Sequence, residues 1–173
     1  MTLLTFPDSG VRIDQFEAIQ AALAERGVPL SRWEAAQPLQ DDDDQATILA
    51  AYEHELKPFM SAGGYQSCDV INVHAETPNL ETIREKFLSE HTHSEDEVRF
   101  FVDGQGEFWF HFEDGVVASL MCQRGDFLSV PKGTKHWFEL APAYHVKAIR
   151  IFTNPDGWVA QYTDSGTDLR YRQ

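Results

Sequence analysis

The sequence predicts a mainly β fold, a small antiparallel barrel or double-sheet jelly roll with helices packed outside it. Three observations lead to this prediction: residues 98–152 contain six short stretches with strand character, turn-forming residues separate these stretches, and helical patterns come earlier in the chain. Short antiparallel strands at this spacing can enclose an interior that holds a ligand. We therefore expect the functional site inside the β-rich part.

The six predicted strands are short runs of apolar or alternating residues bounded by glycine, aspartate or proline. They are Val98–Val102, Glu107–Phe112, Val116–Met121, Phe127–Val130, His136–Leu140 and His145–Phe152. Residues 103–106, 113–115, 124–126 and 131–133 are the predicted turns.

Helical patterns dominate the N-terminal part. Residues 14–26 carry apolar side chains at intervals of three to four, and the pattern ends at Gly27. A second helix is expected after the aspartate run at 41–44, whose last member should cap it, and it should break near Pro58 and residues 63–64.

Shorter elements complete the prediction. Residues 1–12 read as an edge strand, 68–74 as a strand and 80–88 as a third helix. The chain of 173 residues, with 42% hydrophobic content, fits one domain. We divide it into a helical N-terminal part with edge strands (1–89), a barrel core (90–153) and a C-terminal tail (154–173).

The charge excludes several classes of partner. Lys and Arg number 14 against 28 Asp and Glu, a formal charge of −14, so the surface repels nucleic acid and anionic membranes. No stretch approaches the roughly 18 apolar residues that span a bilayer, and no basic segment leads into an apolar run. We expect a cytoplasmic monomer. Cys68 and Cys122 lack a CxxC pattern and are expected to be reduced thiols.

Two segments combine metal-ligand residue types. His91, His93 and Glu97 lie within the first, and His136 ends the second, which begins at Gly125. Residues two apart on a strand face the same side, so the two histidines of the first segment can aim at one point. Imidazole with one carboxylate suits Fe(II), Ni(II), Mn(II), Co(II) or Zn(II), and if His136 joins, four protein ligands leave two positions of an octahedron open. Open positions indicate catalysis or ligand binding.

The glycine and proline spacing around these residues is as distinctive as the ligands. His-x-His-x3-Glu is followed by Gly104, and the second segment reads Gly-x5-Pro-x-Gly-x2-His. This resembles the two-part signature of the cupin superfamily, which implies a jelly-roll barrel with a metal inside. Two positions depart from that pattern, because Glu85 and Leu140 stand where a glycine and an asparagine are expected. Neither is a ligand position.

A narrower resemblance concerns the reaction. The run from Glu90 to Gly106, the run from Gly125 to Phe138, and the run from Arg150 to Trp158 are similar to the acireductone dioxygenase family of methionine salvage. The resemblance implies one Fe(II) or Ni(II) per chain, with the acireductone 1,2-dihydroxy-3-keto-5-methylthiopentene and O2 as substrates. It also implies that Fe gives 4-methylthio-2-oxobutanoate and formate, whereas Ni gives 3-methylthiopropanoate, formate and carbon monoxide.

The resemblance also assigns roles to individual residues. It implies that His91, His93, Glu97 and His136 are the ligands and that Arg99 holds the substrate dianion. It places Glu90 and Asp96 behind the ligands and Phe100, Phe138 and Trp158 in the substrate pocket. Arg99 fits this role chemically, because a guanidinium stays charged at working pH and stabilises negative charge. The alternative is a structural salt bridge.

Other readings stay open. The same ligands could serve another cupin metalloenzyme, an isomerase or a dioxygenase of a different chelating substrate, or a non-catalytic cupin that binds a small ligand. The remaining histidines and two tryptophans are expected to have structural or surface roles; they are His54, His74, His111, His145, Trp109 and Trp137.

Overall fold

The longest strand, β6 (Glu97–His111), belongs to two layers of sheet. Its first half pairs with β8 (Asp126–Val130) and β10 (His145–Phe152), and its second half pairs with β7 (Val117–Gln123) and β9 (Lys135–Glu139). Each half of β6 is therefore the centre of its own layer. The computed structural model describes residues 1–154 and 158–172.

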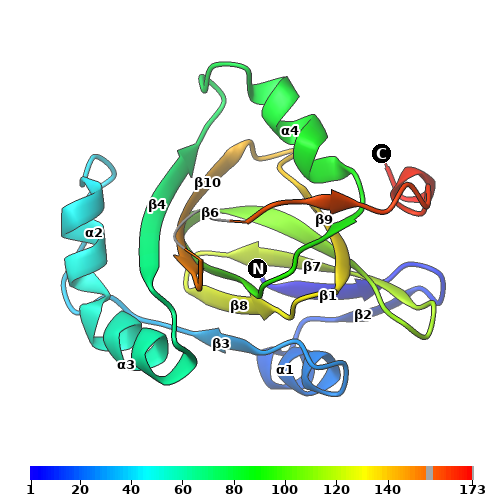
Figure 1. Cartoon of the computed structure of the whole chain (residues 1–173), viewed down its shortest axis with the longest axis horizontal. Coiled ribbons are helices and arrows are strands. Elements are labelled where there is room, and N and C mark those ends of the chain that lie inside the picture. Colours follow the sequence, from blue (N-terminus) through cyan, green and yellow to red (C-terminus); the bar gives the residue numbers. More distant parts are fainter. Residues whose placement is uncertain (155–157, 173) are drawn as a thin grey trace.

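The remaining strands extend these two layers outward. In the first layer, β4 (Ser67–Val73) pairs with β10, and β3 (Leu30–Arg32) pairs with β8. In the second, β9 is followed by β5 (His91–Thr92) and β11 (Gln161–Tyr162), and β7 by β1 (Leu3–Phe6) and β2 (Val11–Ile13). The layers curve around a common interior (Figure 1), which confirms the predicted jelly roll, although its sheet is not closed.

The helices lie outside the sheet. They are α1 (Phe16–Ala24), α2 (Gln45–Ala51), α3 (Glu53–Gly63), α4 (Leu80–Leu88) and the short 3-10 helix η1 (Asp168–Arg170). Figure 1 shows α2 and α3 beside β4, α1 beside β3, and α4 near β9 and β10. The cap predicted for α2 is present, because the Asp44 carboxylate accepts a 2.8 Å hydrogen bond from the Thr47 amide. No helix in the described part of the chain is long and apolar enough to cross a membrane.

Two predicted boundaries are wrong. The second helical region ends at Gly63, as predicted, but it is interrupted at Tyr52, between α2 and α3, whereas Pro58 lies inside α3. Packing explains this: Tyr52 and Leu56 are buried against the first layer, and that contact outweighs the one hydrogen bond that Pro58 cannot donate. The N-terminal strand is also two strands, and β1 lies inside the sheet while β2 forms the edge.

The segment predicted as a turn at 103–106 is part of β6. Gly104 has φ of +76°, and a Cβ there would lie 2.0 Å from the His145 carbonyl oxygen, so glycine permits β6 and β10 to approach closely. Lys147 pairs with Asp103 but Ala148 pairs with Phe101, which leaves Val102 as an extra residue. This bulge bends β6 from one layer into the other.

The bulge also reverses which residues face the interior. Before it, odd-numbered side chains such as Phe101 face inward, and after it even-numbered ones such as Phe108 and Phe110 do. These rings form the core between the two layers. Outward-facing Val98 and Phe100 belong instead to a second core under α2 and α3.

Candidate metal centre

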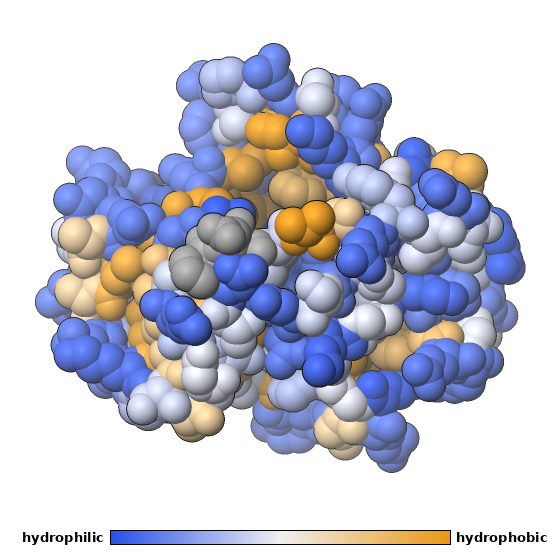
Figure 2. All heavy atoms as spheres, in the orientation of Figure 1, coloured by the Kyte–Doolittle hydropathy of each residue, from blue (hydrophilic) through white to orange (hydrophobic). Residues whose placement is uncertain are grey.

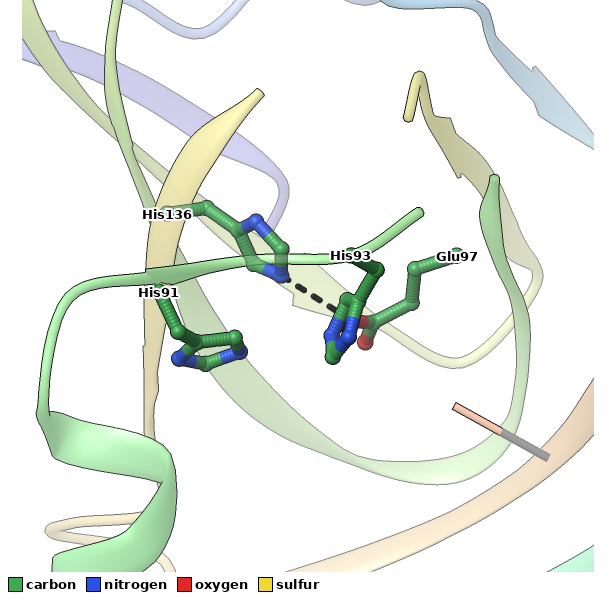
Figure 3. Close-up of side chains that lie close together, drawn as sticks. All are labelled: His91, His93, Glu97 and His136. Atoms are coloured by element: carbon green, nitrogen blue, oxygen red, sulfur yellow. Dashed lines mark hydrogen bonds and ion pairs between the residues drawn. The ribbon is translucent and has the colours of Figure 1, made fainter. Parts of the chain in front are cut away.

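Four predicted ligands come together at one end of the interior. One ligand atom from each of His91, His93, Glu97 and His136 lies within 4.8 Å of the others, and all four residues are buried. His91 and His136 are directly paired across β5 and β9, His93 follows β5, and Glu97 begins β6. Figure 3 shows the four side chains pointing toward one another.

Backbone carbonyls orient the three imidazoles. Nδ1 of His91 lies 2.7 Å from the Ser89 oxygen, and Nδ1 of His136 lies 2.8 Å from the Thr134 oxygen. Nδ1 of His93 lies 2.9 Å from the oxygen of Val159 in the C-terminal tail. A carbonyl oxygen can only accept a hydrogen bond, so each Nδ1 must carry a proton. When such an imidazole is neutral, its Nε2 therefore presents a lone pair to the cluster.

Glu97 is the anionic member. Its Oε2 lies 2.9 Å from Nε2 of His93 and 3.0 Å from Nε2 of His136, and its Oε1 lies 2.8 Å from Nε of Arg99. Burial alone would raise the pKa of Glu97, but the charge of Arg99 and the hydrogen bonds from the two histidines hold it well below its ordinary value. The carboxylate is therefore ionised.

The histidines differ in their affinity for a proton. Burial, reinforced by the neighbouring His136, lowers the pKa of His91 to about 4, so this ring is neutral at pH 7. Burial would also lower the pKa of His93, but its hydrogen bond and attraction to Glu97 outweigh burial and raise it.

These residues fit a divalent transition metal. Three imidazoles with anchored Nδ1 atoms and one ionised carboxylate form a nitrogen and oxygen donor set without thiolate, and their ligand atoms are already gathered. Because a ligand nitrogen must be deprotonated, an ion bound here would displace any proton from the Nε2 atoms that face Glu97. The cluster is suited to hold one divalent transition-metal ion.

Arg99 lies beside the four-residue cluster and is surrounded by aromatic side chains. Four rings, from Phe87, Phe108, Phe138 and Trp158, have centroids 5.0 to 5.8 Å from its Cζ. Nη1 of Arg99 and Nε1 of Trp158 are buried and have no hydrogen-bond partner in residues 1–154 and 158–172. Two buried donors without acceptors beside the four-residue cluster indicate a site where an oxygen atom of a bound small molecule would be held.

The molecular surface opens near this region. In the orientation of Figure 1, Figure 2 shows an apolar hollow next to the part of the surface formed by α4. Phe87, near the C-terminal end of α4, is partly buried and packs against the interior core. An apolar hollow of this kind fits the apolar end of a small molecule.

Glu90 and Asp96 lie behind the ligands. The Glu90 carboxylate accepts hydrogen bonds from Thr163 (2.5 Å) and Ser165 (2.7 Å) and contacts His111 Nδ1 at 2.8 Å. Burial would raise the pKa of Glu90, but these three contacts lower it. Asp96 accepts a 2.9 Å bond from the Lys132 amide. Both carboxylates therefore tie distant segments to the ligand-bearing loop.

The sequence did not identify several residues whose hydrogen bonds hold the ligand-bearing loop in place. Glu95 accepts hydrogen bonds from Thr153 Oγ1 (2.5 Å) and from the Asn154 amide (3.1 Å), which anchors the chain just after β10. Glu95, Thr163 and Ser165 carry no local pattern that would identify them. Residues 155–157, in the run that supported the family resemblance, lie outside the described residues.

Phe100, predicted to line the substrate pocket, lies in the outer core. Phe100 lies on the opposite face of β6 from Glu97 and Arg99, fully buried against Trp33 and Tyr52, with centroids 5.4 and 4.5 Å apart. The structure therefore places Phe100 apart from the other two predicted pocket residues, because alternation along the strand turns its ring to the outer core. Phe138 and Trp158 do lie beside Arg99.

The other histidines and tryptophans lie outside the cluster. His54, His74 and His145 are at the surface, while His111 contacts Glu90. Trp109 and Trp137 stack on the outer face of the second layer, against Tyr171. Cys68 and Cys122 are free thiols, as predicted.

Comparison with known proteins gives a consistent result. The model of the ARD/ARD' family matches residues 12–160. A relative named acireductone dioxygenase from Picosynechococcus is 49% identical over 99% of this chain and 98% of the relative, and one from Parvibaculum lavamentivorans is 47% identical over 99% and 95%. The solved acireductone dioxygenase from Bacillus anthracis, with cadmium in its active centre, has a TM-score of 0.86 at 34% identity, covering 94% of this chain and 98% of that one. The chain belongs to the ARD/ARD' family.

Proposed function

We propose that the chain is a metal-dependent dioxygenase that cleaves the acireductone 1,2-dihydroxy-3-keto-5-methylthiopentene with O2 in methionine salvage. The observation that carries this proposal is the buried cluster of three histidines and a glutamate beside Arg99, whose Nη1 has no partner in the described residues. The named relatives, matched along almost their whole length, support the same activity.

His91, His93, Glu97 and His136 would hold one Fe(II) or Ni(II) per chain. The cadmium in the Bacillus anthracis relative supports a divalent ion at this place in the fold. The bound ion would supply Lewis acidity that keeps the deprotonated enediol electron-rich for reaction with O2. In the proposal, Fe leads to 4-methylthio-2-oxobutanoate and formate, and Ni leads to 3-methylthiopropanoate, formate and carbon monoxide.

Arg99 binds the substrate anion in this proposal. Its Nη1 donates to a substrate oxygen, which satisfies a buried donor and stabilises the negative charge. Burial lowers the pKa of Arg99, and the nearby Glu97 carboxylate opposes that effect. Because a guanidinium keeps its proton, Arg99 acts as a fixed cation and not as a general acid.

The aromatic side chains exclude water and orient the apolar part of the substrate. The rings of Phe138 and Trp158 lie 5.0 and 5.5 Å from Cζ of Arg99, Trp158 also lies 6.2 Å from the ring of His93, and both aromatic side chains would contact the thioether chain. Glu90 and Asp96 hold the segments that carry or adjoin His91 and His93. They position the ligands and do not touch the substrate. We also propose that the protein is a monomer and lies in the cytoplasm.

The proposal is tested with metal-free protein reconstituted separately with Fe(II) and Ni(II). Both forms should consume O2 with the acireductone and release formate, and only the Ni form should release carbon monoxide. Absence of O2 uptake with either metal would contradict the dioxygenase assignment. Turnover of a different chelating substrate would then favour another cupin reaction, and tight ligand binding without turnover would favour a binding protein.

A further inference from the structure

We infer that Gly106 determines how much room the proposed substrate pocket offers, by accommodating the ring of Phe138 beside Arg99. This inference rests on the proposed function and adds a position that selects the length of the acireductone side chain. Gly106 is not one of the four ligand residues, and a Cβ there would meet the ring of Phe138 first, so it is a positioning residue that acts through Phe138.

The geometry at Gly106 leaves no space for a side chain. It lies within β6, opposite Cys122 of β7, and on the interior face after the bulge at Val102. A Cβ there would lie 2.1 Å from Cζ of Phe138, 2.7 Å from Cε2 and 3.1 Å from Cε1. The three nearest heavy atoms all belong to that ring, and Gly106 is not among the glycines with positive φ. Alanine therefore suits the backbone and conflicts with Phe138.

The surroundings of Phe138 decide where its ring would move. On the core side it packs against Phe108, 4.8 Å between centroids, and Phe101, 6.5 Å between centroids, and both are fully buried. The ring centroid of Phe138 is also 5.0 Å from Cζ of Arg99 and 6.4 Å from the partly buried ring of Phe87. Because the core is close-packed, the displaced ring takes the space beside Arg99.

That space is where the apolar chain of the proposed substrate would lie. A ring displaced toward Arg99 shortens the pocket, so a long side chain loses more binding free energy than a short one. One methylene in an apolar pocket changes kcat/KM by about 10- to 200-fold. We expect at least about a tenfold change in selectivity when Gly106 is filled.

The experiment compares two acireductones with the Fe-loaded enzyme, one bearing the methylthio side chain and one ending in a methyl group. Gly106→Ala should lower kcat/KM for the methylthio substrate at least about tenfold more than for the short one, mainly through KM. Gly106→Ala/Phe138→Leu should recover much of the lost selectivity, because the smaller side chain makes room for the added Cβ. Metal content should equal that of the wild type.

Several results would overturn the inference. Equal losses with both substrates, or no recovery in the double variant, would give Gly106 a structural role only. Phe138→Leu alone supplies a test if Gly106→Ala does not fold: it should shift preference toward an ethylthio substrate by several fold, and an unchanged preference contradicts the inference. Wild-type enzyme inactive with both acireductones would instead refute the proposed function.

Discussion

The two faces of the first half of β6 are equally buried but chemically opposite. On the inner face, Glu97 and Arg99 are 3% and 5% exposed and form an ion pair, while on the outer face Val98 and Phe100 are fully buried under α2 and α3. Burying apolar area stabilises a fold by about 25 cal/mol per Å², whereas burying charges costs several kcal/mol unless they are well paired. The outer face therefore supplies stability, and the inner face holds charges that a metal and substrate can use.

The largest effect is expected at the ligands. His93→Ala removes one of the imidazoles that face Glu97, so the metal content should fall to background and activity should be lost. Elemental analysis of purified protein measures this. His54→Ala, a substitution at the surface of α3, is the matched control and should keep one metal per chain. Full metal in the His93 variant would show that the ligand set is wrong.

The outer face should respond in stability and not in metal content. Phe100→Ala removes a fully buried ring from the core with Trp33 and Tyr52, and we expect the free energy of unfolding to fall by about 3–5 kcal/mol. Urea unfolding checks the change, and metal analysis at low temperature should still find a loaded site. If substrate KM rises while stability is unchanged, Phe100 belongs to the pocket after all.

Arg99→Ala should lower the catalytic activity and leave the metal content unchanged. The variant should keep its metal but lose about 10²- to 10³-fold in kcat/KM, as when one donor to a reacting anion is removed, about 2.7–4 kcal/mol. Steady-state O2 uptake at saturating and limiting substrate measures the loss. Arg99→Lys keeps the charge without the planar donors and should be intermediate. Wild-type rates would reduce Arg99 to a structural partner of Glu97.

A smaller effect is expected at the ion pair that joins α4 to β9. Arg84 donates two 2.7 Å hydrogen bonds to Glu139, and both side chains are 18% exposed. Burial would raise the pKa of Glu139, but the bonds from Arg84 and the Ala141 amide lower it. Glu139→Gln should cost about 1.5 kcal/mol at pH 7, in the range for hydrogen bonds to charged groups.

The pH dependence of this effect has a definite sign. Because the folded pKa of Glu139 is below its unfolded value of about 4.3, the pair stabilises the fold above that pH, and the contribution is lost as the pH falls through the folded pKa. Unfolding curves of wild type and Glu139→Gln should therefore converge at acidic pH. A difference that grows on acidification would contradict this reading.

Much of the site was predictable because its information is local. Spacing makes His91, His93 and Glu97 candidate ligands, the family resemblance adds His136, and alternation along a strand places Arg99 on the face of Glu97. The same alternation assigns Phe100 to the outer face, and the structure follows alternation where family resemblance predicts a pocket.

The rest depends on tertiary contacts that leave no local signal. The bulge at Val102 changes which residues of β6 face inward. The inward position of Phe108 could therefore not be predicted by counting alternate residues from Arg99. Strands β5 and β11 have two residues each and exist because they pair beside β9. His93 is oriented by the carbonyl of Val159, 66 residues away.

The most direct test is a titration of metal-free protein with Ni(II), in which O2 uptake and carbon monoxide release with the acireductone are recorded at each addition. The account predicts that both rise together and level off at one Ni(II) per chain, because one buried cluster binds the ion that activates the substrate. Glu97→Ala should give no rise at all. Uptake that is independent of added metal, or equally strong in Glu97→Ala, would contradict the claim that the inner face of β6 carries the chemistry.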